Sequence, residues 1–154
     1  MDWSKALEDF RHCVGPLCDI LIEGTTLRDW QAVMDALRRS EFDLEFKTGN
    51  RIVALPADLS GLLDPNSNET SSLRVFFANT SANCHFFAEE LIEFDLQPRD
   101  IDGEAIAALS DLLRLLGEAT GKPVLVQIEN APDLPILCYE PDTAGFDYLG
   151  PSRV

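Results

Sequence analysis

The sequence predicts a single α+β domain: one antiparallel sheet of about six strands, with helices packed on one face. Segments with apolar residues at helical spacing are separated by segments in which apolar and polar residues alternate, and short turns join several neighbouring strands. The chain has 154 residues, of which 45% are hydrophobic, the usual size and composition of one domain. We therefore treat residues 1–154 as one folding unit.

The N-terminal quarter predicts a helix, a strand and a second helix. The first helix is short and amphipathic and ends at Gly15-Pro16. An apolar run predicts a strand within residues 19–25. Thr26, with Asp29 three positions later, matches a capping box and begins a second helix over about 27–39. The apolar faces expected to be buried are Trp3, Leu7, Phe10 and Val14 in the first helix, and Leu27, Trp30, Met34 and Leu37 in the second.

The next segment predicts two strands joined by a tight turn. Apolar and charged residues alternate over 42–47, and Gly49-Asn50 offers a two-residue hairpin turn before a second apolar run at 52–55. Residues 56–72 are rich in Pro, Asp, Asn, Ser and Thr. We expect them to form a flexible loop, interrupted by one helical turn that contains Leu59, Leu62 and Leu63.

A further pair of strands is predicted at 73–77 and 92–97, where apolar residues alternate with polar ones. Residues 79–83 are polar and are interpreted as a turn. The sequence leaves the conformation of residues 85–91 open between strand and helix.

The C-terminal third predicts a third helix and a last hairpin. Asp102 is suited to cap the helix, and Gly121 ends it. Apolar strands at 124–129 and 134–139 then flank a turn. The buried stripe expected on the helix consists of Ile106, Leu109, Leu113 and Leu116.

Two segments, 20–55 and 92–139, share the element order strand, helix, strand, strand. This order suggests two βαββ repeats related by a pseudo-twofold axis, with both helices on one face of the sheet. The other face would then be free and would be the natural binding surface. Residues 140–154 follow as a tail, which either lies over an apolar edge or becomes ordered when a partner binds.

The chain carries 27 Asp and Glu against 12 Lys and Arg, a formal net charge of −15. The acids are densest between residues 89 and 104, where Arg99 is the only base. In the predicted strand, Glu93 and Asp95 point away from the face that carries Ile92 and Phe94, because side chains alternate between faces. The candidate binding site is this acidic stripe, which consists of Glu89, Glu90, Glu93, Asp95, Asp100, Asp102 and Glu104.

The sequence indicates neither export nor a membrane span. Asp2, Lys5, Glu8 and Asp9 interrupt the apolar core that a signal peptide requires. No apolar run approaches the roughly 20 residues of a membrane helix. We therefore expect a soluble, cytoplasmic protein without membrane contact, whose cysteines are thiols. Its net charge repels phosphate, so direct nucleic-acid binding is not expected.

The sequence predicts no metal site, no cofactor and no catalytic centre. Cys13 and Cys18 have four residues between them, and no second ligand pair follows at zinc-site spacing. Cys84 and His85 are adjacent, so in a strand they would point to opposite faces and could not act as nucleophile and base. Cys138 lies within an apolar run. We expect most of these thiols to be buried and inert.

The composition favours a non-catalytic binding protein that engages a basic protein partner through the acidic stripe, because opposite charges speed association. In size and acidity the chain is similar to small secretion chaperones and to immunity or inhibitor proteins that neutralise basic toxins, an analogy that rests on no motif. Two alternatives stay open. One is an enzyme or small-ligand protein with a pocket between sheet and helices. The other is an oligomeric structural module, such as a homodimer, in which the free sheet face pairs with a second copy.

Overall fold

The computed structural model describes residues 1–13, 15–129, 131 and 133–150, which form three α-helices, a short 3-10 helix and one antiparallel sheet. The predicted class, α+β with a single sheet, is confirmed, but the sheet has nine strands rather than about six. The helices are α1 (Trp3–Arg11), α2 (Leu27–Arg39), η1 (Pro98–Asp100) and α3 (Gly103–Thr120). The strands are β1 (Cys18–Glu23), β2 (Asp43–Thr48), β3 (Arg51–Val53), β4 (Ser71–Phe77), β5 (Thr80–Ala88), β6 (Leu91–Leu96), β7 (Val124–Ile128), β8 (Pro135–Glu140) and β9 (Gly145–Tyr148).

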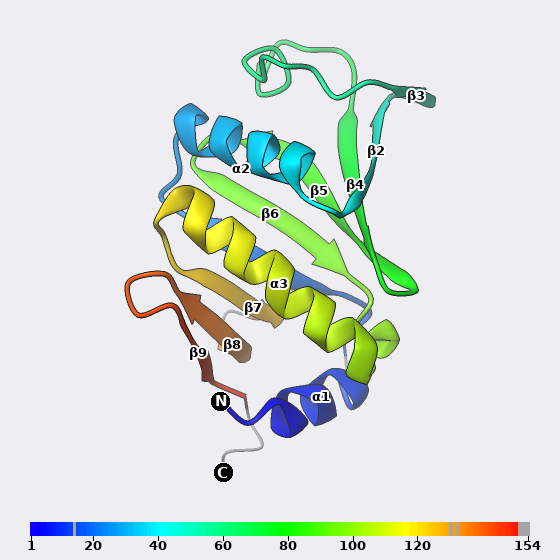
Figure 1. Ribbon diagram of the computed structural model, residues 1–154. Helices are drawn as coiled ribbons and strands as arrows, with labels where there is room; N and C mark the ends of the chain where they lie inside the picture. Colours follow the sequence, from blue (N-terminus) through cyan, green and yellow to red (C-terminus); the bar gives the residue numbers. More distant parts are fainter. Residues whose placement is uncertain (14, 130, 132, 151–154) are drawn as a thin grey trace.

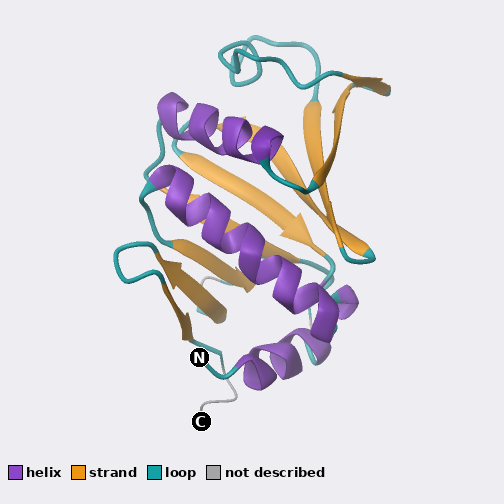
Figure 2. Ribbon diagram, viewed as in Figure 1, coloured by secondary structure: helices purple, strands orange, loops and turns teal. Residues whose placement is uncertain are grey.

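The strands follow the order β3-β2-β4-β5-β6-β1-β7-β8-β9, and all neighbouring pairs are antiparallel. Helices α2 and α3 lie side by side across one face of this twisted sheet, and α1 lies near the start of α3 (Figure 1). Within the described part of the chain, the helices lie on this side of the sheet (Figure 2). The opposite side, without a helix, is called the open face below.

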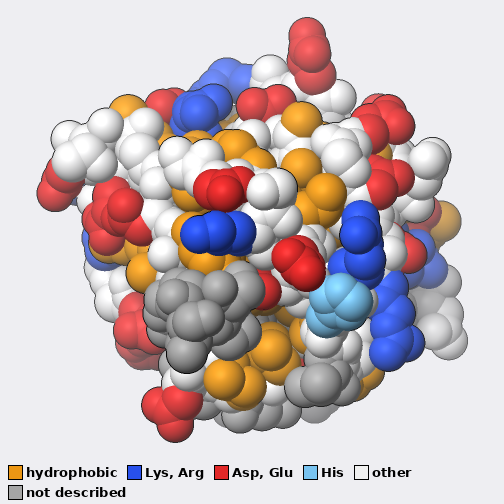
Figure 3. Space-filling model, turned by 90° about the horizontal axis from the view of Figure 1, so that it is seen from below, with side chains coloured by type: hydrophobic (Ala, Val, Ile, Leu, Met, Phe, Trp, Pro, Cys, Tyr) orange, Lys and Arg blue, Asp and Glu red, His pale blue; other side chains and the backbone are white. Residues whose placement is uncertain are grey.

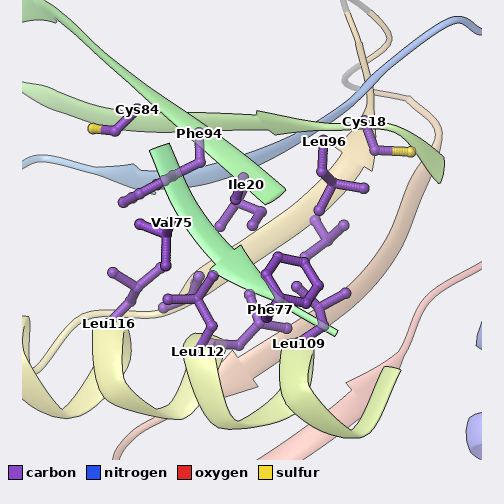
Figure 4. Close-up of a cluster of buried hydrophobic side chains, with 14 of the residues drawn as sticks. Cys18, Ile20, Val75, Phe77, Cys84, Phe94, Leu96, Leu109, Leu112 and Leu116 are labelled. Carbon is purple, nitrogen blue, oxygen red and sulfur yellow. The ribbon is translucent and has the colours of Figure 1, made fainter. Parts of the chain in front are cut away.

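The layer between sheet and helices is filled with apolar side chains. Figure 4 shows Ile20, Val75 and Phe94 on the side of the sheet that faces Leu112 and Leu116 of α3, and all five residues are fully buried. The predicted buried stripe of the third helix is confirmed, because its four residues all belong to this core. A filled layer of this kind makes the sheet a rigid support for the residues on its open face.

Helix α2 begins as the sequence predicts and fixes the nearby β5–β6 turn. Thr26 and Asp29 form a complete capping box. The indole Nε1 of Trp30 donates to the carbonyl oxygen of Glu89 at 3.0 Å, and the hydroxyl of Thr25 donates to the same oxygen at 2.7 Å. The turn that follows β5 is therefore held against the start of α2.

The interpretation of residues 79–83 as a turn is wrong. Only Ala78 and Asn79 form the turn, and Thr80 begins β5. The strand continues to Ala88, so the segment left open between strand and helix is extended up to that residue. The alternation of inward and outward residues in β5 is hard to see in the sequence, because its first inward-facing residues, Ala82 and Cys84, are small.

The tail, as far as residue 150, lies against the helices. Its strand β9 was not predicted. Phe146 contacts Trp3 with ring centroids 4.9 Å apart, and the Tyr148 hydroxyl donates to Asp9 at 2.5 Å. This arrangement agrees with the first of the two expected alternatives, a tail that covers an apolar edge. Residues 151–154 lie outside the described residues, as do Val14 of the first predicted helix face and Asn130 and Pro132 of the last predicted turn.

The structure does not confirm the predicted repeat. Both segments keep the order strand, helix, strand, strand, and their first strands, β1 and β6, pair at the centre of the sheet. However, β7 lies directly beside β1, whereas β2 is separated from β6 by β4 and β5. The strands of the two units are therefore not placed equivalently about the central β1–β6 pair.

The segment predicted as a flexible loop, 56–72, is tied to α2 at its beginning. Leu59 is fully buried, and Leu62 donates its N–H to the Leu59 carbonyl in one turn, as predicted. Gln31 of α2 donates from Nε2 to the carbonyl of Ala57 at 2.7 Å. Residues 71 and 72 belong to β4. The flexibility of the remainder stays a prediction.

Within the described residues, no helix has the length and apolar character needed to cross a membrane.

Candidate binding face

The open face is formed by the side chains that alternate with the buried ones along the strands. The pairing of the strands places the following described residues on it: Asp43, Glu45, Lys47, Ile52, Ser72, Arg74, Phe76, Ser81, Asn83, His85, Phe87, Leu91, Glu93, Asp95, Asp19, Leu21, Glu23, Leu125, Gln127, Cys138, Glu140 and Asp147. This face collects residues from all nine strands of the described sheet and is therefore a surface that only the folded chain presents.

Acids dominate the charge of the open face. Lys47 and Arg74 are the only Lys or Arg side chains among the residues just named, and Lys47 lies 3.7 Å from Glu45. The carboxylates are Asp19, Glu23, Asp43, Glu45, Glu93, Asp95, Glu140 and Asp147, of which Asp19 is buried and the others are partly or fully exposed. The half of the face around β1, β7, β8 and β9 holds acids without any Lys or Arg among these residues, so it presents the more negative potential.

Two members of the acidic stripe lie on the open face, as predicted. Glu93 and Asp95 project from β6 away from the buried Ile92 and Phe94. Asp95 sits opposite Asp19 of β1, and Glu93 sits opposite Leu21. These two carboxylates can therefore act together with acids from other strands.

The other members of the acidic stripe lie beyond the two ends of β6. Glu89 and Glu90 form the β5–β6 turn, where the Glu89 carboxylate accepts a hydrogen bond from the Leu27 N–H at 3.2 Å. At the other end, Asp102 caps α3 and Glu104 lies in its first turn. Asp100, in η1, accepts from the Thr80 hydroxyl at 3.1 Å. Six residues of extended strand span about 20 Å, so the acidic stripe is three separate groups of carboxylates.

A hydrogen-bonded chain crosses the open face from β4 to β6. Arg74 donates to Asn83 at 3.1 Å, Asn83 donates to Asp95 at 3.3 Å, and the other oxygen of Asp95 lies 2.6 Å from Nε2 of His85. The His85 ring stacks on Phe87, with centroids 5.1 Å apart. Phe87 is 73% exposed. The chain of contacts therefore fixes polar groups beside a large aromatic ring that faces solvent.

The open face also contains an apolar hollow of about 350 Å³. Its lining residues are Leu21, Glu23, Pro123, Leu125 and Cys138. Strand pairing places Leu21, Leu125 and Cys138 in one row across β1, β7 and β8. None of these apolar positions was identified from the sequence as part of a site, because they come from three separate parts of the chain.

The four thiols differ in exposure. Cys13, Cys18 and Cys84 are buried, whereas Cys138 is intermediate. The sulfur atoms of Cys13 and Cys18 lie 3.8 Å apart, and burial together with the neighbouring Cys13 raises the pKa of Cys18 well above its ordinary value. Burial also raises the pKa of Cys84. Cys18 and Cys84 are consequently protonated at neutral pH. The burial of three of the four thiols agrees with the expectation from the sequence, whereas their inertness stays a prediction.

Cys138 titrates differently from an exposed thiol. Its partial burial, followed by the charges and hydrogen bond of Glu140 and the charge of Asp147, raises the pKa of Cys138 to about 11. The thiol lies 3.6 Å from Glu140 Oε1. The charges of Glu140 and Asp147 therefore both affect a thiol that lines the apolar hollow.

No geometry for nucleophilic or metal chemistry is formed by the residues considered above. Cys84 points into the core while His85 lies on the open face, because β5 is extended through both. No group of three or more His, Cys, Asp or Glu within the described ranges is arranged to hold a metal ion.

Two larger grooves lie on the outer surface of the helices. One, of about 540 Å³, runs between α2 and α3, and the other, of about 490 Å³, lies between α3 and the β4–β5 turn. Neither is lined by a histidine, and both share Asp111 and Leu115. Seen from the side on which α1 lies, acidic and basic side chains are interspersed (Figure 3). The enzyme or small-ligand alternative required a pocket between the sheet and the helices. In the described part of the chain, buried apolar side chains fill this layer instead.

No family model, no curated protein and no solved structure matches this chain. Function is therefore inferred from the charge and geometry of the open face.

Proposed function

We propose that this protein is a non-catalytic binding module that engages a basic protein partner through the open face of its sheet. One observation carries this proposal: a sheet face that no described helix covers and on which carboxylates from five strands outnumber Lys47 and Arg74. Such a face attracts a cationic partner and orients it during the encounter. An immunity, inhibitor or chaperone-like role would use such an interaction.

The exposed aromatic residues of this face support the proposal. Phe87 and Phe76 are 73% and 36% exposed, and the Arg74 guanidinium lies 5.8 Å from the centre of the Phe76 ring. Aromatic residues and arginine are enriched at protein interfaces, where they supply most of the binding energy. The open face therefore combines charge, which brings a partner in, with apolar area, which retains it.

The charge of the open face disfavours the homodimer alternative. Two copies that met through it would bring the acids around β1, β7 and β8 against acids of the same kind, and like charges placed together cost several kcal/mol. The enzyme or small-ligand alternative has less support, because the layer between sheet and helices is occupied by residues such as Ile20, Phe94 and Leu112.

The test compares two variants that lose the same charge at different places. The open-face variant carries Glu23→Gln, Glu93→Gln and Asp147→Asn. The helix-face variant carries Glu41→Gln, Asp111→Asn and Glu118→Gln, and these three residues are exposed and line the outer grooves. A fluorescent peptide of ten lysines is the probe, and fluorescence anisotropy at 20 mM and 200 mM salt is the measurement.

We expect the lysine peptide to bind the unmodified protein at low salt and to bind much more weakly at high salt. The open-face variant should lose about tenfold in affinity, and the helix-face variant should change by less than about threefold. Equal losses in both variants would show that binding follows total charge alone and would overturn the proposal, as would the absence of binding at low salt.

A further inference from the structure

A cross-strand row on the open face has carboxylates at both ends and apolar residues between them. The registers of β6, β1, β7, β8 and β9 place Glu93, Leu21, Leu125, Cys138 and Asp147 in successive positions. Neighbouring strands lie about 4.8 Å apart, so the apolar part spans about 10 Å and the two carboxylates stand about 19 Å apart. This length fits one large side chain with a charged group on either side.

The apolar part of this row is the floor of the 350 Å³ hollow. Leu21, Leu125 and Cys138 are partly exposed, and Pro123 closes one side. The volume lies at the lower end of the range for ligand-binding pockets, which is enough for a side chain and too small for a folded segment. An unfilled apolar hollow on an otherwise polar face is a typical position for the anchor residue of a partner.

Three acidic residues lie at or next to the hollow. Glu23 lines the hollow directly, and Glu140 accepts from the Cys138 thiol at 3.6 Å. Asp147 is the cross-strand neighbour of Cys138. Lys47 and Arg74 belong to β2 and β4, at least three strands away from β1. A cation next to an apolar side chain would therefore meet carboxylates and neither Lys47 nor Arg74.

We propose that this hollow binds one apolar side chain of the basic partner, in a segment where that residue stands beside lysine or arginine. The apolar side chain would lie on Leu21 and Leu125, and the adjacent cation would face Glu23, Glu140 or Asp147. This inference rests on the proposed function, because it specifies which part of a basic partner contacts the open face.

The first experiment separates apolar contact from charge. Two labelled peptides are compared, Lys-Leu-Lys-Leu-Lys and Lys-Ser-Lys-Ser-Lys, which carry equal charge. Because the leucine side chain buries apolar area in the hollow, the first peptide should bind at least about fivefold more tightly. Leu21→Ser should remove this difference. Leu134→Ser is the matched control, since Leu134 is 39% exposed and does not line the hollow, and it should leave the difference intact.

The second experiment uses the unmodified protein and does not depend on the folding of a variant. Cys138 is the one thiol of the four that is not buried, so a maleimide should label it first. Occupancy of the hollow should slow this reaction, measured by mass spectrometry at pH 8. Saturating leucine peptide should slow labelling by at least about fivefold, whereas the serine peptide at equal occupancy should slow it by less than about twofold.

The outcomes distinguish this inference from the proposed function. If the two peptides bind equally, or if the leucine peptide binds more tightly without protecting Cys138, the hollow is not the anchor site, although a basic partner can still use the open face. If neither peptide binds at low salt, the proposed function itself fails. Tighter binding that depends on Leu21, together with protection of Cys138, supports both.

Discussion

The packing of α3 against β8 depends on the absence of a side chain at Gly117. Gly117 lies on the buried face of α3 against Tyr139 of β8, which is itself fully buried. A Cβ atom at position 117 would overlap Cδ2 of the Tyr139 ring and lie 2.6 Å from its Cε2. The ring also contacts Phe146 of β9, with centroids 4.8 Å apart. This glycine therefore lets the helix lie directly against the Tyr139 ring of β8.

Gly117→Ala should destabilise the protein by about 1–3 kcal/mol, because the added methyl group forces the ring or the helix to move in a filled core. The measurement is the free energy of unfolding in urea. Gly103→Ala is the control in the same helix, where no atom lies within 4 Å of the added Cβ. It should be neutral or stabilising by up to about 1 kcal/mol, since alanine favours helix. A neutral Gly117→Ala variant would contradict the packing described.

At the scale of elements, α2 combines a strong start signal with contacts to distant parts of the chain. Thr26 and Asp29 close the capping box, and Asp29 also lies 3.1 Å from the ammonium group of Lys122. The start of α2 further holds the β5–β6 turn through Trp30. The cap therefore stabilises both a helix and the turn that carries Glu89 and Glu90.

Thr26→Ala should lower the free energy of unfolding by about 0.5–2 kcal/mol, because the N–H of Asp29 loses its hydroxyl acceptor. Thr26→Ser keeps that acceptor and should remain within about 0.5 kcal/mol of the unmodified protein. Urea unfolding followed by circular dichroism gives both values. Equal stability of the alanine and serine variants would show that the cap contributes nothing.

Helices α2 and α3 could be predicted well from this sequence because their signals are local, whereas α1 ends at Arg11, before the predicted end at Gly15-Pro16. The start of α2 and the glycine that ends α3, Gly121 with φ +67°, follow directly from residue types. Strand β5 could not be predicted in the same way. Its inward residues Ala82 and Cys84 are small, so their burial depends on Leu73, Val75 and Phe94 of the strands beside them.

The candidate site was even less accessible from sequence. Adjacent acids are visible along the chain, and the faces of Glu93 and Asp95 followed from strand alternation. The grouping of Leu21, Leu125 and Cys138 depends instead on which strands pair and in which register. That information arises from tertiary structure. The acidic stripe predicted from the sequence therefore contains only Glu93 and Asp95 of the open face, whose other residues come from strands elsewhere in the chain.

At the scale of the whole molecule, the net charge of −15 opposes compactness. Raising the salt concentration from 10 mM to 150 mM shortens the screening length from about 30 Å to about 8 Å. The melting temperature should rise by about 2–4 °C, which corresponds to about 1 kcal/mol for a chain of this size. Differential scanning calorimetry measures this, with the open-face variant as comparison. The melting temperature of the open-face variant should rise less with salt. A fall in the melting temperature of the unmodified protein would exclude self-repulsion as an important factor.

The contact of Tyr148 with Asp9 joins the last strand to the first helix. The two ends of the described part of the chain therefore lie close together. We call the contact between α1 and β9 the seam. A short peptide link across that seam, with new termini opened in the long connection between β3 and β4, would leave every strand and helix uncut. Circular permutation of this kind would keep the Leu21–Cys138 hollow intact, because neither the seam nor the cut lies within it.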